Sequence, residues 1–343
     1  MPRKLDSDSQ IGRRLRLRDL HLFFTVVQHG SMAKAASQLG ISQPSVSEVI
    51  ADLEHTLGAR LFDRRPRGVE LTMYGDALLT RTRAVFDELR QGVKEIEFLA
   101  DPSGGEVRIG CSVAASVTFL RPIIHGFSEA FPGVALRVED VPPASWEHSG
   151  LRQRKHDLLL QWCATPLSTH ILGSDVKVEF LFDDHLVVAA GPQSRWARRR
   201  RIDLAELVGE RWILGPAGTA NYECIAEAFL ALGLAMPKIV LETLSVPLRT
   251  YFLVTGQFIA AMPQSIASQL PVKILPVELA VRPWQFAIFT LKNRTVSPVV
   301  ERFIGHLRDF ARSMPRTRRP AGVNSAKNSR ASVAMLRSPR WSF

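Results

Sequence analysis

The stretch that decides the fold is Ser31–Leu61, SMAKAASQLGISQPSVSEVIADLEHTLGARL. Ser31 can cap a short helix through its hydroxyl, and Gly40 can end that helix in the left-handed conformation. Ser42 can cap a second helix, with Pro44 in the first turn, where its missing N–H costs nothing. Apolar residues share one face of each helix: Ala33, Ala36 and Leu39 on the first, and Val46, Ile50, Leu53 and Leu57 on the second. This pattern predicts a helix-turn-helix, whose second helix enters the major groove of DNA.

The flanks of this stretch complete a small winged domain over residues 17–72. Apolar residues at helical spacing predict a helix over Leu17–His29 that packs on the two that follow. Residues 58–72 alternate apolar and polar side chains around a turn with Pro and Gly, which predicts a β-hairpin, or wing. Three arginines near its tip would suit contact with phosphates or the minor groove: Arg64, Arg65 and Arg67. Without the neighbouring motif, a solvated turn would be the better interpretation.

A long helix is expected next, over residues 73–100, with Thr72 as its cap. Its apolar residues follow the three–four spacing of a coiled-coil seam: Leu79, Phe86, Leu89, Val93 and Ile96. Such a stripe often packs on its own domain. Here the helix leaves a small domain and runs into a hinge-like segment, DPSGG at residues 101–105, so we interpret the stripe as a dimer seam.

The following part of the chain, residues 106–311, alternates strands and helices, which predicts an α/β fold with a parallel sheet. The series restarts near residue 183, and the chain is expected to return to the first series near Pro263. We therefore predict two lobes with a cleft between them: lobe I from residues 106–182 and 264–311, and lobe II from residues 183–263. The pattern also predicts helices over Thr118–Phe131 and His148–Lys155, and a lobe I strand over Lys273–Val277.

The composition of the 343 residues, 46% hydrophobic and 22% charged, is that of an ordinary globular protein with room for two or three domains. No apolar run reaches the about 18 residues of a membrane span, and we see no signal peptide at the N-terminus. The three cysteines are widely spaced and form no CxxC pair. No metal site or cofactor is therefore expected, and a reduced, cytoplasmic compartment fits best.

The net charge of +11 is unevenly placed along the chain. Residues 312–343 carry +8, whereas residues 1–100 carry only +2, so the high charge by itself is weak support for DNA binding. This tail is expected to be disordered and could add salt-dependent affinity for DNA. A second basic run, RWARRRR at residues 195–201, could contact nucleic acid, but a solvated loop is the simpler interpretation, and the role of Arg198–Arg201 stays open.

Residues 17–311 resemble the LysR-type transcriptional regulators. The likeness is carried by the series AA–LGISQPSVS–I–LE–LG–LF–R–LT–G, which matches at many fixed offsets, and by the α/β part beginning GEVRIG. The resemblance implies an α/β protein with an N-terminal all-α winged helix-turn-helix, a dimerising linker helix and a two-lobed effector domain like periplasmic binding proteins. It also implies a homodimer or dimer of dimers that binds promoter DNA and responds to a small molecule, with contact to RNA polymerase left open.

The exposed N-terminal end of the second helix should reach the base edges. Gln43 can pair bidentately with adenine, and Glu48 can accept a hydrogen bond from a cytosine amino group. Arginine is common in the family where Glu48 stands, so the preferred operator is expected to differ from that of relatives with arginine. For Ser42, helix capping and DNA contact are both left open. Besides the wing arginines, the expected DNA-binding residues are Ser31, Lys34, Ser42, Gln43, Pro44, Ser45, Ser47 and Glu48.

A ligand is expected between the lobes, at the carboxyl ends of strands. The loop Cys111–Ser116 offers amide groups and hydroxyls that would suit a carboxylate at a helix N-terminus. The expected effector-binding residues are Ser112, Ser116, Gln161, Trp162 and Thr219. Trp162 could instead belong to the core, and Thr219 could only cap a helix. Cys111 and Cys163 near the cleft could form a redox pair, as in some relatives, but small buried thiols are the expected state.

Two other classes of function fit less well. A solute-binding protein or metabolite sensor without DNA specificity would need only the α/β part, and the winged motif argues against it. An enzyme would need a catalytic motif, and the sequence contains no GxSxG, HExxH, P-loop or GxGxxG. We therefore interpret the chain as an effector-responsive, sequence-specific transcriptional regulator without catalytic residues.

Overall fold

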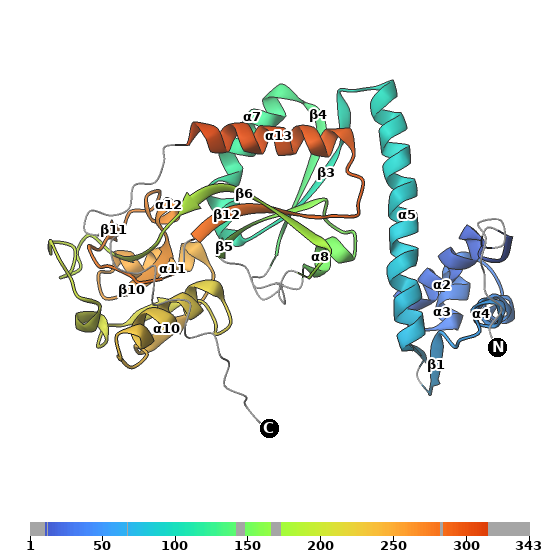
Figure 1. The fold of residues 1–343 in the computed structure, drawn as a ribbon, viewed down its shortest axis with the longest axis horizontal. Coiled ribbons are helices and arrows are strands. Elements are labelled where there is room, and N and C mark those ends of the chain that lie inside the picture. The colour runs from blue at the N-terminus through green and yellow to red at the C-terminus, as the bar shows by residue number, and fades with distance from the viewer. Residues whose placement is uncertain are drawn as a thin grey trace. The chain divides into compact units, whose positions relative to one another are not determined.

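The computed structural model describes residues 11, 13–66, 68–141, 148–165, 173–281 and 284–314. The chain divides into two compact units (Figure 1). No helix in these ranges is both long and apolar enough to cross a membrane. Unit 1 holds the residues through Pro102 together with Gly150–His156 and Arg294–Pro298, and unit 2 holds Ser103–Ser149, Asp157–Asn293 and the residues from Val299 onward.

Unit 1 begins with three short helices: α2 (Leu17–His29), α3 (Met32–Leu39) and α4 (Gln43–Leu57). Each ends at a glycine in the left-handed conformation, as predicted for Gly40, whose φ is 65°. Their apolar faces meet in one core around large side chains such as Phe23. The expected stripe on α3 is wrong at one position, because Ala35 and Ala36 are buried and Ala33 is exposed. These small side chains let α4 cross α3 closely.

The predicted wing consists of the antiparallel strands β1 (Phe62–Arg65) and β2 (Gly68–Leu71). Gly68 has a φ of 144°, and a Cβ atom there would lie 2.2 Å from the carbonyl oxygen of Gly30. The same oxygen accepts a hydrogen bond from the N–H of Val69 at 2.9 Å. The hairpin therefore rests directly on the turn between α2 and α3, and only glycine fits at the start of β2.

The longest helix, α5 (Met73–Ala100), begins and ends as expected, and Thr72 Oγ1 accepts the N–H of Gly75 at 3.1 Å. The predicted seam divides into two halves. Leu79 is buried in the core of the winged domain, so its assignment to a dimer seam is wrong. Phe86 is half-buried and packs edge-on against His21, with 6.0 Å between ring centroids. The later seam residues are exposed: Leu89, Val93 and Ile96.

Asp87 joins α5 to the two short segments of unit 1. Its carboxylate accepts hydrogen bonds from Arg294 Nε at 2.6 Å and from Arg154 Nη1 at 2.9 Å. Arg294 also donates to the carbonyl oxygen of His156 at 2.8 Å. Burial by itself would raise the pKa of the Asp87 carboxyl, but the hydrogen bonds and charges of Arg294 and Arg154 outweigh it and hold the pKa below its usual value. Arg90 Nη1 also lies 3.5 Å from Asp87 Oδ1, so three arginines share this buried, ionised carboxylate.

Lobe I of unit 2 is built on a sheet with the strand order β4-β3-β5-β12-β6. Its strands are β3 (Gly104–Cys111), β4 (Gly133–Asp140), β5 (Leu158–Ala164), β6 (Val176–Asp184) and β12 (Trp284–Leu291). β3 is parallel to β4 and β5, whereas β12 is antiparallel to β5 and β6, so the sheet is mixed. Helices α7 (Leu120–Ala130) and α13 (Pro298–Ser313) lie side by side along it (Figure 1), where the rings of Phe127 and Phe303 are 5.0 Å apart.

Two helices of the sequence prediction differ from the structure. The expected helix over Thr118–Phe131 is α7, which begins two residues later, and the short helix α6 (Val113–Val117) before it was not predicted. Thr118 separates the two helices, because it leaves the helical conformation and donates its hydroxyl to the carbonyl oxygen of Ala114 at 2.7 Å. The expected helix over His148–Lys155 is only α8 (Ser149–Arg152), because Arg154 adopts a positive φ of 60°.

Lobe II is built on a second sheet with the order β11-β7-β10-β8-β9. Its strands are β7 (Leu186–Ala190), β8 (Trp212–Leu214), β9 (Ile239–Glu242), β10 (Ile259–Pro263) and β11 (Lys273–Ile274), and its helices are η1 (Leu204–Leu207), α10 (Ala220–Ala231), α11 (Val246–Val254) and α12 (Gln264–Ala267). Because β11 pairs with β7, the predicted return to lobe I at residue 264 is wrong. The chain returns to lobe I between β11 and β12.

Candidate functional site

The N-terminal end of α4 is exposed, as expected for a helix that reads DNA. Gln43, Pro44, Ser45 and Glu48 are all exposed. Ser47 is half-buried, and its hydroxyl donates to the sulfur of Met32 at 3.4 Å, which holds α4 against α3. Ser47 is therefore the least available of the residues expected to contact DNA from this helix.

Ser31 and Ser42 both serve as helix caps. Ser31 Oγ accepts the N–H of Lys34 at 3.5 Å, and Ser42 Oγ accepts the N–H of Ser45 at 3.3 Å. The hydroxyl oxygens of Ser42 and Ser45 lie 2.8 Å apart and share a hydrogen bond. Since only one of these two hydroxyls donates to the other, the second proton can still be donated outward. The cap role of Ser42 is therefore observed, and its contact with DNA stays a prediction.

The basic side chains around α4 differ in how freely they can move. Lys34 and Arg64 are exposed. Arg65 Nε pairs with Glu70 across the hairpin at 3.1 Å, but both side chains are exposed, so the pair is weak and can open toward a phosphate. Arg67, the third arginine expected at the wing, lies outside the described residues.

Glu54 is a residue of this region that sequence reasoning missed. Its Oε1 accepts the N–H of Leu61 at 2.7 Å and the N–H of Phe62 at 3.2 Å, where the wing begins. The carboxylate therefore fixes the wing relative to α4. The signal was present in the sequence, because an acidic residue in the last turn of a helix opposes the helix dipole and implies a partner elsewhere.

A cavity of about 340 Å³ lies between the two lobes of unit 2. This volume falls in the range of small-molecule sites. Lobe I contributes Ser112, Val113, Ala114, Asp140, Val141, Gln161, Trp162 and Trp284. Lobe II contributes Thr219, Ala220, Asn221, Leu244, Val246, Arg249, Met262, Pro263, Ile266 and Leu270. The cavity thus gathers residues at or just beyond the carboxyl ends of strands such as β3, β5 and β10, where a ligand was expected.

The two serines expected in this cleft have different outcomes. Ser112 lines the cavity, but its hydroxyl oxygen caps α6 by accepting the N–H of Ala115 at 3.3 Å. Ser116 is not part of the cavity wall, and its hydroxyl donates to the carbonyl oxygen of Val113 at 2.9 Å, so its assignment is wrong. Because α6 has only five residues, little dipole supports the expected anion site at its start.

Gln161 and Trp162, near the end of β5, both line the cavity as expected. Trp162 belongs to the core as well, because its ring packs 4.7 Å from that of Phe286 and its Nε1 donates to Asp184 at 2.9 Å. Gln161 is only 5% exposed, and among the described residues its amide nitrogen has no hydrogen-bond partner. A buried amide without a partner can donate to a ligand in the cavity.

Thr219 lines the cavity from lobe II, but its hydroxyl is occupied within its own loop. It donates toward the carbonyl oxygen of Pro216 at 2.7 Å and lies 2.9 Å from Asn221 Oδ1. The threonine forms no side-chain cap on α10, so the alternative that it only caps a helix is wrong. Thr219 therefore shapes the wall and keeps only its oxygen lone pairs for a ligand.

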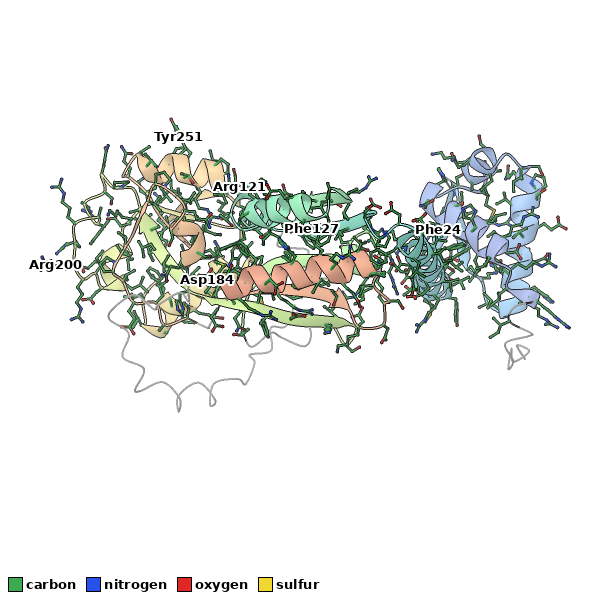
Figure 2. All side chains as sticks on the ribbon, turned by 90° about the horizontal axis from the view of Figure 1, so that it is seen from above. Phe24, Arg121, Phe127, Asp184, Arg200 and Tyr251 are labelled. Atoms are coloured by element: carbon green, nitrogen blue, oxygen red, sulfur yellow. The ribbon has the colours of Figure 1, made fainter. Side chains whose placement is uncertain are left out.

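Arg249 on α11 is the cavity residue that sequence reasoning most clearly missed. It is 7% exposed and lies on the same buried helix face as Val246 and Leu253, whereas Tyr251 points outward (Figure 2). The signal was an arginine at helical spacing with apolar residues, on a face that should otherwise be apolar.

The three cysteines are buried. Burial raises the pKa of the Cys163 thiol to about 12, and burial together with the charge of Asp140 does the same for Cys111. Cys224 accepts a hydrogen bond from Trp284 Nε1 at 3.3 Å, which links α10 of lobe II to β12 of lobe I. Since redox chemistry needs an accessible thiolate, the burial and raised pKa of Cys111 and Cys163 argue against a redox pair.

Two family models match the chain over the parts just described. Residues 17–76 match the bacterial regulatory helix-turn-helix protein, lysR family, and residues 100–312 match the LysR substrate binding domain. The chain belongs to the LysR family. It is a LysR-type, DNA-binding transcriptional regulator that carries an effector-binding domain.

Known proteins resemble the chain over most of its length. The HTH-type transcriptional regulator GbpR of Azospirillum brasilense is 27% identical over 317 residues, which is 90% of either protein. The RuBisCO operon transcriptional regulator of Allochromatium vinosum is 31% identical over 218 residues, covering 63% of this chain and 69% of that protein. A solved structure of a full-length OxyR variant from Pseudomonas aeruginosa covers 89% of this chain and 98% of its own at 20% identity, with a TM-score of 0.63 that shows the shared fold.

Proposed function

We propose that this LysR-family regulator binds promoter DNA as a homodimer or a dimer of such dimers, and that a small molecule in the interlobe cavity controls the binding. The observation that carries the proposal is the cavity itself, whose walls come from both lobes and include buried polar side chains. A ligand that contacts both lobes favours one lobe arrangement over others. That shift would change the spacing of the recognition helices and so the occupancy or bend of the promoter.

Dimerisation is supported by the second half of α5. Leu89, Val93 and Ile96 follow one another at spacings of four and three residues and are all exposed, with Val93 at 55% and Ile96 at 68%. A row of exposed apolar side chains at this spacing is the pattern of a two-helix seam. A second copy would supply the same stripe and would place two α4 helices on half-sites about one DNA turn apart.

The exposed residues of α4 support a specific form of base recognition. Gln43 would pair with adenine, and Glu48 would accept from the amino group of cytosine. Lys34 and Arg64 would contact phosphates, which position the domain without reading sequence. Because α4 has no lysine or arginine, binding would depend on these flanking cations more than on a basic helix. Such a promoter-binding protein would act in the cytoplasm, where bacterial DNA lies.

We further propose that the effector is a small organic acid. The cavity wall holds two buried hydrogen-bond donors from opposite lobes, the Gln161 amide and the Arg249 guanidinium. Carboxylate oxygens accept such bonds, and a charged acceptor makes them stronger. A carboxylate between the two donors would join the lobes.

The decisive experiment is selection of bound duplexes from random DNA by the full-length chain, with and without pools of small organic acids. We expect one recurring two-fold-related site, and we expect a pool that contains the effector to change either the selected spacing or the footprint. If no sequence is enriched, the proposed mode of DNA recognition is wrong. If the site and footprint stay the same with every pool, control through the cavity is wrong.

Two glutamine variants supply a matched pair for this selection. Gln43 lies on the exposed end of α4, and Gln28 is an exposed glutamine on α2. Gln43→Ala should relax the preference at one base position per half-site, at a cost of about 1–3 kcal/mol. Gln28→Ala should leave the selected site unchanged. Equal effects of the two changes would contradict the assignment of α4 as the reading helix.

A further inference from the structure

The feature that carries the inference is a buried cation at the wall of the cavity. Arg249 Nη2 donates to the carbonyl oxygen of Thr243 at 2.8 Å, and Nη1 donates to the carbonyl oxygen of Ala261 at 3.4 Å. No carboxylate among the described residues pairs with this guanidinium, and its Nε has no acceptor there. Burial lowers the pKa of Arg249 to about 10, so the group still carries its charge at neutral pH.

Such a group is costly for the free protein. A buried charge is normally paired with an opposite charge, because neutral acceptors offset only part of the lost hydration. Asp87 in unit 1, which is shared by three arginines, shows the usual solution. Arg249 has only two neutral carbonyl acceptors, and it lines the cavity of about 340 Å³. The missing counter-charge is therefore expected from a molecule in that volume.

The other walls limit what that molecule can be. Most of the lining is apolar, with Val141, Leu244 and Met262 as examples. Gln161 adds one further buried donor. Asp140 contributes a negative charge at the lobe I wall, which would repel a second anionic group. The chemistry of the walls fits one anionic group on a mainly apolar body.

We propose that Arg249 binds the anionic group of the effector, and that the effector is a monoanion with an apolar body. The inference rests on the proposed function of the cavity as the effector site and names the ligand class of that site. It assigns the anion to the Arg249 side chain on α11 of lobe II and not to the N-terminus of the short helix α6. A forked guanidinium matches the two oxygens of a carboxylate.

The test uses a series of straight-chain probes on the full-length protein: butanoate, hexanoate and octanoate, their primary amides, and hexanedioate. Isothermal titration should show that hexanoate binds at least about tenfold more tightly than hexanamide, because loss of a charge-assisted hydrogen bond has this order of effect. Hexanoate should bind more tightly than butanoate because of the apolar walls. Hexanedioate should bind no more tightly than hexanoate.

Variants then assign the effect to one side chain. Arg249→Gln should reduce the affinity for hexanoate by about ten- to a hundredfold and leave the affinity for hexanamide nearly unchanged. Arg249→Lys keeps the charge but loses the fork, and should bind hexanoate with intermediate affinity. The matched control is Arg211→Gln, because Arg211 is an exposed arginine of lobe II outside the cavity wall, with its guanidinium over Phe258. Circular dichroism of each variant checks folding, and the lysine variant serves if the glutamine variant does not fold.

The outcomes separate this inference from the proposed function. Equal binding of hexanoate and hexanamide by the wild-type protein, or an unchanged preference in Arg249→Gln, would overturn the role of Arg249 while leaving the cavity as a ligand site. Failure of every acid and amide to bind at millimolar concentration would overturn both. Without ligand, the wild-type protein and Arg249→Gln should bind DNA with the same affinity. If neither protein binds DNA, the proposed function is wrong.

Discussion

At the scale of single residues, Glu48 is the side chain with the strongest expected effect on DNA choice. It is exposed at the N-terminal part of α4, and in the proposed complex its negative charge would face the phosphates of the DNA. Glu48→Arg should tighten binding to random DNA and make the plot of log K against log salt steeper by about 1, the value for one added phosphate contact. It should also change the preferred base from cytosine to guanine at one position per half-site. Fluorescence anisotropy over a salt series and repeated DNA selection measure the two effects.

A charge change elsewhere on α4 serves as the comparison for Glu48. Asp52 is exposed one turn later on the same helix, farther from the end that reaches the bases. Asp52→Arg should steepen the salt dependence in the same way but leave the preferred base unchanged. If both variants change the preferred base equally, or if Glu48→Arg does not change it, Glu48 does not read a base.

The residues of the cleft were only partly predictable from sequence. Gln161 and Trp162 were found because they end the predicted third strand of the α/β part, and strand ends meet at the cleft. Ser116 was wrong, because it lies inside the short helix α6, where its hydroxyl donates to the carbonyl oxygen of Val113. Arg249 was missed, because its role depends on which face of α11 is buried and on the absence of a carboxylate partner among the described residues. Both depend on tertiary packing, which the local sequence does not show.

At the scale of elements, Asp87 is expected to determine how firmly α5 holds its two partner segments. Asp87→Asn should lower the free energy of unfolding by about 3–5 kcal/mol at neutral pH, because it leaves the buried Arg294 without its counter-charge. The folded-state pKa of Asp87 lies below the ordinary value of 3.8. The stabilisation is therefore fully present above that value and is lost as the pH falls through the folded-state pKa. Denaturant unfolding of the two proteins at several pH values measures the difference.

The control for Asp87 removes a carboxylate from an exposed position of the same helix. Glu95 is exposed, and Glu95→Gln should change the free energy of unfolding by no more than about 0.5 kcal/mol. The difference between wild type and Asp87→Asn should shrink toward acid pH. A difference that persists well below pH 3.8 would show that the carboxylate's charge is not what stabilises the contact.

The exposed half of α5 leads to a prediction about assembly. Val93 and Glu95 are two residues apart, so they lie on nearly opposite faces of the helix. Val93→Lys should weaken the homodimer by about tenfold or more, because it places two like charges in a seam that loses apolar burial. Glu95→Lys adds the same side chain away from the seam and should leave the dimer intact. Sedimentation equilibrium measures the dimer dissociation constant of each protein. If the wild-type protein is monomeric, or if both variants dimerise equally, the exposed stripe of α5 is not a dimer seam.

Elements that depend on neighbouring residues were predicted more accurately than elements that depend on residues far away in the sequence. Helices α2 and α5 were predicted with their bounds and α4 with its start, because caps such as Ser42 and Thr72 and the apolar spacing are local signals. Strand β6 was not predicted, and β11 was assigned to the wrong lobe. Both are defined by pairing with strands distant in sequence, β12 and β7, which a local pattern does not reveal.

At the scale of the whole molecule, the order of its parts was predictable because each has its own pattern. The winged domain, the long helix and the two-lobed part follow in the expected order, although the exact lobe boundary was not found. The distribution of charge could also be read from the sequence. It suggests that general affinity for DNA and recognition of a specific sequence come from different parts of the chain. The part that reads DNA is nearly neutral, whereas residues 315–343, outside the described ranges, carry seven Lys or Arg and no Asp or Glu.

This separation of charge predicts what removal of the tail would do to the regulator. A chain ending at Met314 keeps a net charge of only +4, so its affinity for random DNA at low salt should fall by about tenfold or more, with a shallower salt dependence. Affinity for the selected operator should fall less, because the base contacts proposed for α4 would not involve the tail, and the ratio of specific to random binding should rise. Anisotropy titrations of operator and random duplexes over a salt series measure this ratio.

A full-length chain with every tail Lys and Arg changed to Gln should match the truncated one, since charge and not length is responsible. If that neutral tail restores wild-type affinity, or if truncation lowers both affinities equally, the tail does not act as a non-specific electrostatic arm.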